Sequence, residues 1–115
     1  MKVEITTERT ERGSLLKLKG DVDMNSSPDL RAALGKILRE GGSSGRALFV
    51  NLSQVRYMDS SGIATLVEAL QTCMKQGIRL RLVELSPPVR DVFELARLSG
   101  VFEIFSSMED AGKGL

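Results

Sequence analysis

The stretch Tyr57-Met58-Asp59-Ser60-Ser61-Gly62-Ile63 lies where an apolar run gives way to a segment with helical periodicity. The run before it, 47–52, reads Ala-Leu-Phe-Val-Asn-Leu and is typical of a strand covered on both faces in a parallel sheet. The residues after it recur at the spacing of one buried helix face: Ile63, Leu66, Val67, Leu70, Cys73 and Met74. The stretch therefore predicts a strand followed by an amphipathic helix, with two hydroxyls and a carboxylate at the junction.

The junction residues have the chemistry of a helix start. Asp59 suits the N-cap, because its carboxylate can accept hydrogen bonds from the free amides of Ser61 and Gly62. Ser60 then takes the first helical position. Gly62 lowers helix propensity by about 1 kcal/mol relative to Ala, which indicates that something approaches the backbone closely there. A partner surface and a neighbouring strand would both explain it.

The rest of the chain alternates between strand-like and helix-like segments. Two strand-like runs, 2–10 and 14–22, flank a turn at 11–13 and predict an antiparallel hairpin. The later expected elements are a helix from Ser26-Ser27-Pro28-Asp29, a loop at 41–45, a strand at 78–83 that alternates as one nearer the sheet edge would, a helix from Pro87 closed by Gly100, a strand at 101–105 and a helical stub at 107–111. This order predicts one α/β domain over 1–115. Its central sheet is mixed and mostly parallel, with an antiparallel N-terminal edge and three to four helices.

Composition narrows the function. The 115 residues include 16 basic and 15 acidic side chains, which are interspersed, so no basic stripe indicates nucleic acid and no polybasic block indicates anionic lipid. A protein surface is the expected partner. The single cysteine, Cys73, excludes an internal disulfide and is expected in the core. No secretory segment and no apolar run of roughly 20 residues is present, so we expect a cytoplasmic protein without membrane insertion.

The chain lacks the residues of common catalytic sites. It contains no histidine, so neither a Ser-His-Asp nor a Cys-His nucleophile can form, nor a histidine-ligated zinc. It also lacks a G-x-S-x-G elbow, a complete P-loop and a dinucleotide fingerprint. We therefore expect no enzyme and no cofactor, and Ser60 is better interpreted as a substrate than as a nucleophile.

Three segments carry a family resemblance. They are Leu-Lys-Gly-Asp-Val-Asp at 18–23, Asn-Leu-Ser-Gln-Val-Arg-Tyr-Met-Asp-Ser-Ser-Gly-Ile at 51–63, and Val-Phe-Glu-Leu-Ala-Arg-Leu-Ser-Gly-Val at 92–101. In this order they resemble the STAS domain of bacterial anti-sigma factor antagonists, over nearly the whole chain. The middle segment is the most specific, because an apolar strand, a loop, Asp-Ser-Ser-Gly and an apolar-faced helix occur together. The resemblance implies a STAS-type fold.

The resemblance also implies a mechanism. In that family the serine after the aspartate is phosphorylated by an anti-sigma factor that is also a serine kinase, which points to Ser60. The unphosphorylated protein binds that kinase and frees a sigma factor, the phosphorylated one is released, and a serine phosphatase resets it. Asp23 and Asp59 match acidic positions near the acceptor. Asn51 stands where many members carry Asp, a departure that leaves this interpretation intact.

Each site residue also has a structural explanation. Asp59 fits a simple helix cap, and Asp23 fits a turn at the end of a strand. Ser61 fits a helix start or a second acceptor. Met58 and Tyr57 fit either the core or an apolar rim for the partner. The residues alone leave these alternatives open.

Two other functions fit STAS-like single domains. Such domains also resemble the small cytoplasmic subunit of lipid-transport ABC complexes, where the role is structural. Others act in signalling pathways in which a kinase and a phosphatase compete for the same serine without a sigma factor. The intact Asp-Ser-Ser-Gly favours a phosphorylation switch over the transporter subunit.

Overall fold

The computed structural model describes residues 3–40 and 46–115. The elements alternate in the predicted order: β1 (Glu4–Thr10), β2 (Gly13–Val22), α1 (Ser27–Arg39), β3 (Ala47–Met58), α2 (Ser60–Gln76), β4 (Arg79–Val83), α3 (Pro87–Leu95), β5 (Glu103–Phe105) and α4 (Met108–Ala111). The loop expected at 41–45 lies outside the described residues. Within the described ranges, no helix is both long and apolar enough to cross a bilayer.

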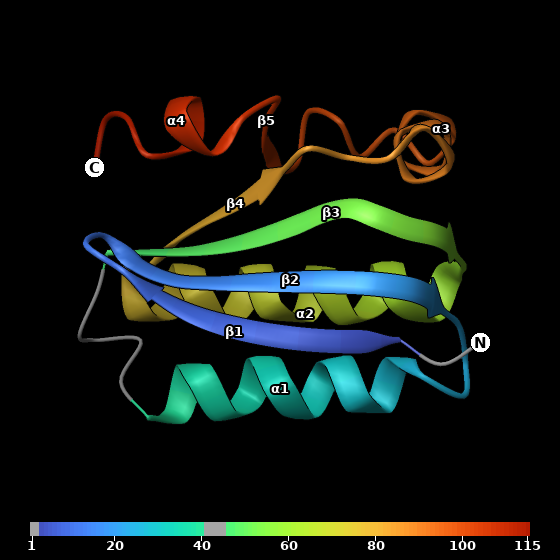
Figure 1. Cartoon of the computed structure of the whole chain (residues 1–115), viewed down its shortest axis with the longest axis horizontal. Helices are drawn as coiled ribbons and strands as arrows, with labels where there is room; N and C mark the ends of the chain where they lie inside the picture. The colour runs from blue at the N-terminus through green and yellow to red at the C-terminus, as the bar shows by residue number, and fades with distance from the viewer. Residues whose placement is uncertain (1–2, 41–45) are drawn as a thin grey trace.

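One five-stranded sheet organises the molecule in the order β1-β2-β3-β4-β5. β1 and β2 are antiparallel, and the other neighbours are parallel. The buried side chains of α1, α2 and α3 share one core cluster with Leu48, Val50 and Leu82 on one face of the sheet, whereas Ala111 of α4 packs with Phe49 and Val83 on the other. Figure 1 shows the strands side by side, with α2 behind β1 and β2. The predicted α/β fold with an antiparallel N-terminal edge is therefore confirmed.

β3 is twice as long as the apolar run suggested. It continues from Ala47 through Met58 without the expected loop. Its register with β2 shifts between Lys17 and Lys19 and again between Gly20 and Asp21. Each irregularity inserts an extra residue into β3 and interrupts the alternation of buried and exposed side chains along the strand. Val55 and Met58 are nevertheless both buried. β3 therefore runs almost directly into α2, with only Asp59 between them.

β4 lies next to the edge strand β5, but both of its faces are covered, contrary to what its alternation suggests. Leu80, Arg81, Leu82 and Val83 are all buried. Arg81 is tolerated there because its Nε donates to Glu103 Oε1 at 3.0 Å and its Nη1 donates to the carbonyl of Ala111 at 2.7 Å. These hydrogen bonds replace the ones that an exposed arginine would make to water.

α3 ends earlier than predicted. Gly100 was expected to close it, but the helix stops at Leu95, with Ala96 as the C-cap. Arg97 adopts φ +58, a left-handed conformation that ends the helix. The turn is therefore made by a residue that glycine-based sequence signals do not reveal.

Candidate functional site

The carboxyl ends of β2 and β3 meet where α2 begins. Val22 pairs with Met58, and the Asp59 amide donates to the Val22 carbonyl at 3.1 Å. Asp23 and Asp59, the residues that follow the two strands, therefore lie at the same end of the sheet. We call this region, with the first turn of α2, the Ser60 end; it lies on the right in Figure 1.

Asp59 caps α2 as predicted. Its Oδ1 accepts hydrogen bonds from the Ser61 amide at 2.9 Å and the Ser61 hydroxyl at 2.6 Å. The Gly62 amide, expected on the same carboxylate, donates instead to the Asp59 backbone carbonyl at 3.1 Å. The capping prediction is thus correct for Ser61 and wrong for Gly62. The reason is geometric, since the carbonyl of the N-cap residue already accepts the first helical bond.

The two serines of the junction differ. Ser60, the first residue of α2, is exposed, and its hydroxyl has no hydrogen-bond partner among the residues described by the structure. The Ser61 side chain is half-buried and bound to Asp59, and its carbonyl accepts the Thr65 hydroxyl at 2.9 Å. Of these two serines, only Ser60 presents an unbonded hydroxyl at the surface of the described residues.

Asp23 organises the turn after β2. Its Oδ1 accepts from the amides of Asn25 and Ser26 at 2.9 and 3.0 Å, and its own amide donates to Ser26 Oγ at 2.9 Å. The Ser26 amide, with the Asn25 amide as a smaller contributor, lowers the pKa of Asp23 against an opposing desolvation effect. The turn role is thus real, and it also fixes a negative charge at the Ser60 end.

Met58 and Gly62 shape this end from beneath. Met58 is 2% exposed and belongs to the core. A Cβ on Gly62 would lie 2.8 Å from both Met58 Cγ and Val22 Cγ1. Neighbouring strands therefore explain the glycine, and a partner surface is not needed. Both residues are buried, so neither exposes a surface that a partner could contact.

Two apolar side chains do reach the surface here. Tyr57 is 51% exposed, so it lies outside the core, and Met24 in the Asp23 turn is 77% exposed. Sequence reasoning missed Met24. The available signal was a large apolar residue within a polar turn.

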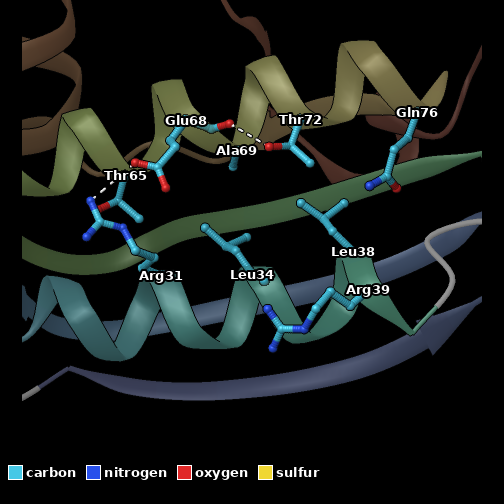
Figure 2. Close-up of a pocket in the computed structure, with 10 residues that line it drawn as sticks. Arg31, Leu34, Leu38, Arg39, Thr65, Glu68, Ala69, Thr72 and Gln76 are labelled. Carbon is cyan, nitrogen blue, oxygen red and sulfur yellow. Dashed lines mark hydrogen bonds and ion pairs between the residues drawn. The ribbon is translucent and has the colours of Figure 1, made fainter.

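A separate cavity of about 360 Å³ lies between α1 and α2 (Figure 2). Leu34 and Leu38 point into it from α1, and an ion pair of 3.3 Å joins Arg31 to Glu68 across one end. It is lined by none of the predicted site residues. Within residues 3–40 and 46–115, no group of three or more His, Cys, Asp or Glu side chains could hold a metal ion.

Curated relatives cover almost the whole chain. The anti-sigma-B factor antagonist of Bacillus subtilis (strain 168) is 28% identical over 109 residues, which are 95% of this chain and 96% of that protein. The protein of the same name from Staphylococcus aureus (strain NCTC 8325 / PS 47) is 26% identical, covering 95% and 98%.

Solved structures share the fold. An anti-sigma factor antagonist from Mycobacterium paratuberculosis superposes with a TM-score of 0.83 at 25% identity, covering 95% of this chain and 90% of that one. SpoIIAA matches in its unphosphorylated form with a TM-score of 0.78, 24% identity and coverage of 94% and 92%. The phosphorylated Bacillus form gives 0.72 at 23% identity, covering 94% and 96%. The family model for the STAS domain matches residues 4–111, so this chain belongs to the STAS domain family.

Proposed function

We propose that this protein is an anti-sigma factor antagonist that is switched by phosphorylation of Ser60. Unphosphorylated, it binds an anti-sigma factor with serine kinase activity and so releases a sigma factor; a serine phosphatase reverses the modification. The observation that carries this proposal is the exposed, unbonded Ser60 hydroxyl beside Ser61, whose hydroxyl is held by Asp59. The names of the curated relatives support the class of partner.

The site geometry supports release of the partner without unfolding. A phosphate adds about −1.5 to −2 charges, and the amides and dipole of a helix N-terminus favour that charge. The fold is therefore retained. Asp23 and Asp59 already place carboxylates at the Ser60 end, so the added charge makes this surface strongly negative and opposes docking of an acidic or apolar partner surface.

The test is affinity capture from native cells with four baits. Wild type and Ser60→Ala should retain a small ATP-binding kinase, and wild type should acquire phosphate on Ser60. Ser60→Asp should bind that kinase at least about tenfold more weakly, a loss of roughly 1.4 kcal/mol. Mass spectrometry identifies both the partner and the modified residue.

Ser106→Asp is the matched control for charge. Ser106 is exposed and directly follows β5, whose Phe105 pairs with Val83, which in turn pairs with Asn51. Asn51 lies seven residues before Met58, roughly 20 Å along a strand, so this charge lies far from the Ser60 end. Equal binding by folded Ser60→Ala and Ser60→Asp contradicts the switch. Equal capture of a permease and an ATPase by every bait indicates a transporter subunit instead.

A further inference from the structure

We propose that Met24 and Tyr57 are the apolar anchors by which the serine kinase docks beside Ser60. The inference rests on the proposed function and deepens it by assigning the docking surface and the chemistry of the partner. We call these two side chains, with the Ser60 hydroxyl beside them, the anchor surface. The expected occupant is a kinase surface with two apolar pockets next to the site that receives the hydroxyl.

Backbone pairing brings the two anchors to the Ser60 end. Tyr57 pairs with Asp21 across β2 and β3, and the next pair along is Val22 with Met58. Met24 lies two residues beyond Val22, and Tyr57 lies three residues before Ser60. The other large exposed apolar side chains of the described residues belong to other segments of the chain: Met74 late in α2, Leu95 at the end of α3 and Val101 before β5. Two of the five thus belong to the ends of β2 and β3, where α2 begins.

Both anchors stand on rigid backbone. The Met24 turn is fixed by the Asp23 carboxylate, by the bond from the Asp23 amide to Ser26 Oγ, and by a 2.7 Å bond from the Ser27 amide to the Asp23 carbonyl. Tyr57 belongs to the ladder between β2 and β3. The backbone that carries them is therefore preorganised, which lowers the backbone entropy lost when a partner binds.

The surrounding charges specify the partner further. Tyrosine and methionine are enriched in the cores of protein interfaces, and tyrosine is frequent among their energetic hot spots. Here both lie beside the carboxylates of Asp23 and Asp59, whose hydrogen-bond acceptors require donors in any tight contact. The matching kinase surface therefore combines apolar pockets with neutral hydrogen-bond donors, such as amides and hydroxyls.

The anchor surface also explains why phosphate would end binding. An apolar pocket closes favourably only when water leaves the interface. A phosphate on Ser60 is strongly hydrated, and burying it beside Met24 and Tyr57 without full pairing would be costly. Release then follows from the cost of desolvating the phosphate.

The experiment compares matched methionines. The kinase that wild type captures and that phosphorylates Ser60 is purified, and its dissociation constant is measured by calorimetry for Met24→Gln, Tyr57→Thr and Met74→Gln. Met24 and Met74 are 77% and 71% exposed, so the two glutamine variants make the same change at the same exposure. We expect Met24→Gln and Tyr57→Thr each to weaken binding about tenfold. Met74→Gln should stay within about twofold of wild type.

The outcomes separate the two proposals. If Met24→Gln and Tyr57→Thr both bind within about twofold of wild type, or if Met74→Gln loses as much as they do, the anchor surface is wrong. The contrast between Ser60→Ala and Ser60→Asp would still support the switch. If wild type captures no kinase and Ser60 carries no phosphate, both proposals fail. Thermal melting of each variant verifies that all are equally folded.

Discussion

Gly62 shows how one missing side chain sets the geometry of the Ser60 end. Met58 is 2% exposed and Val22 is fully buried, and both lie against the backbone of Gly62. The first turn of α2 can therefore sit directly on the ends of β2 and β3. This close approach is what brings the exposed Ser60 over the strand that carries Tyr57.

We predict opposite effects for two Gly→Ala substitutions. At Gly62 the new Cβ meets two buried side chains at 2.8 Å, so overpacking should outweigh the gain of about 1 kcal/mol in helix propensity and destabilise by roughly 1–2 kcal/mol. At Gly35, in α1, the Cβ meets only the flexible end of Arg39, at 3.0 Å. Gly35→Ala should therefore stabilise by up to about 1 kcal/mol. Urea unfolding measures both; stabilisation by Gly62→Ala would refute the packing argument.

At the scale of elements, a buried arginine of the sheet binds the C-terminal segment. Arg81 of β4 donates to the carbonyls of Ala111 and Lys113, and its guanidinium lies 5.0 Å from the centroid of the Phe105 ring. Ala111 packs against Leu15, Ala47, Phe49 and Val83. α4 has only four residues, too few to be stable alone. Its position therefore depends on Arg81.

Arg81→Met should release α4. The carbonyls that lose their donor would each cost about 1–3 kcal/mol if they stayed buried, so we expect about 2–3 kcal/mol of lost stability after partial solvation. Hydrogen exchange should also speed up at 108–113. Arg79→Met is the matched control, because Arg79 is an exposed partner of the same Glu103. Loss of this exposed ion pair should affect stability far less than loss of Arg81. Similar effects of the two variants would show that Arg81 does not hold the segment.

An element could be predicted from the sequence where it depends on neighbouring residues, and not where it depends on residues far along the chain. The start of α2 depends on neighbouring residues, so Asp59 and the helix face were identified from local signals. Met74 was assigned to that face by spacing, but it is 71% exposed because no element covers it among the described residues. The length of β3 depends on bulges against β2, and the burial of Arg81 depends on carbonyls thirty residues later. Long-range partners of this kind leave no local pattern.

At the scale of the whole molecule, two carboxyls link stability to pH. The hydrogen bond from Arg79, with a smaller contribution from Arg81, lowers the pKa of Glu103 below its ordinary value of 4.5. The pKa of Asp23 is likewise below 3.8, mainly through the Ser26 amide. Both groups bind protons more weakly in the folded chain. Their stabilising contribution is therefore complete above these ordinary values and is lost as the pH falls through the lower folded values.

We predict that the free energy of unfolding falls as the pH decreases below about 4.5. Glu103→Gln should be less stable than wild type at neutral pH and should lose less stability on acidification, because it has no proton to gain at that position. Denaturant unfolding between about pH 7 and 3 tests this. An acid dependence that is unchanged in Glu103→Gln would exclude Glu103 as a contributor.

The site was only partly predictable for a related reason. The order of residues at the junction identified Asp59, Ser60 and Ser61, because capping is local. The exposure of Met24 and the burial of Met58 depend on how β2 and β3 end together, which is a property of the sheet. Local chemistry thus located the start of α2, whereas the surroundings of Ser60 depend on the packed molecule.

The parallel pairing of β2 with β3 gives the molecule a lengthwise polarity. Ser60 lies at one end, and Leu115 lies toward the other, where Arg12 in the turn between β1 and β2 donates to the Gly112 carbonyl (Figure 1). These ends are separated along a body whose longest extent is 32 Å. A tether or fluorophore attached through Leu115 would therefore leave the opposite end facing bulk solvent. The protein can thus be attached to a solid support while an enzyme in solution still reaches the Ser60 end.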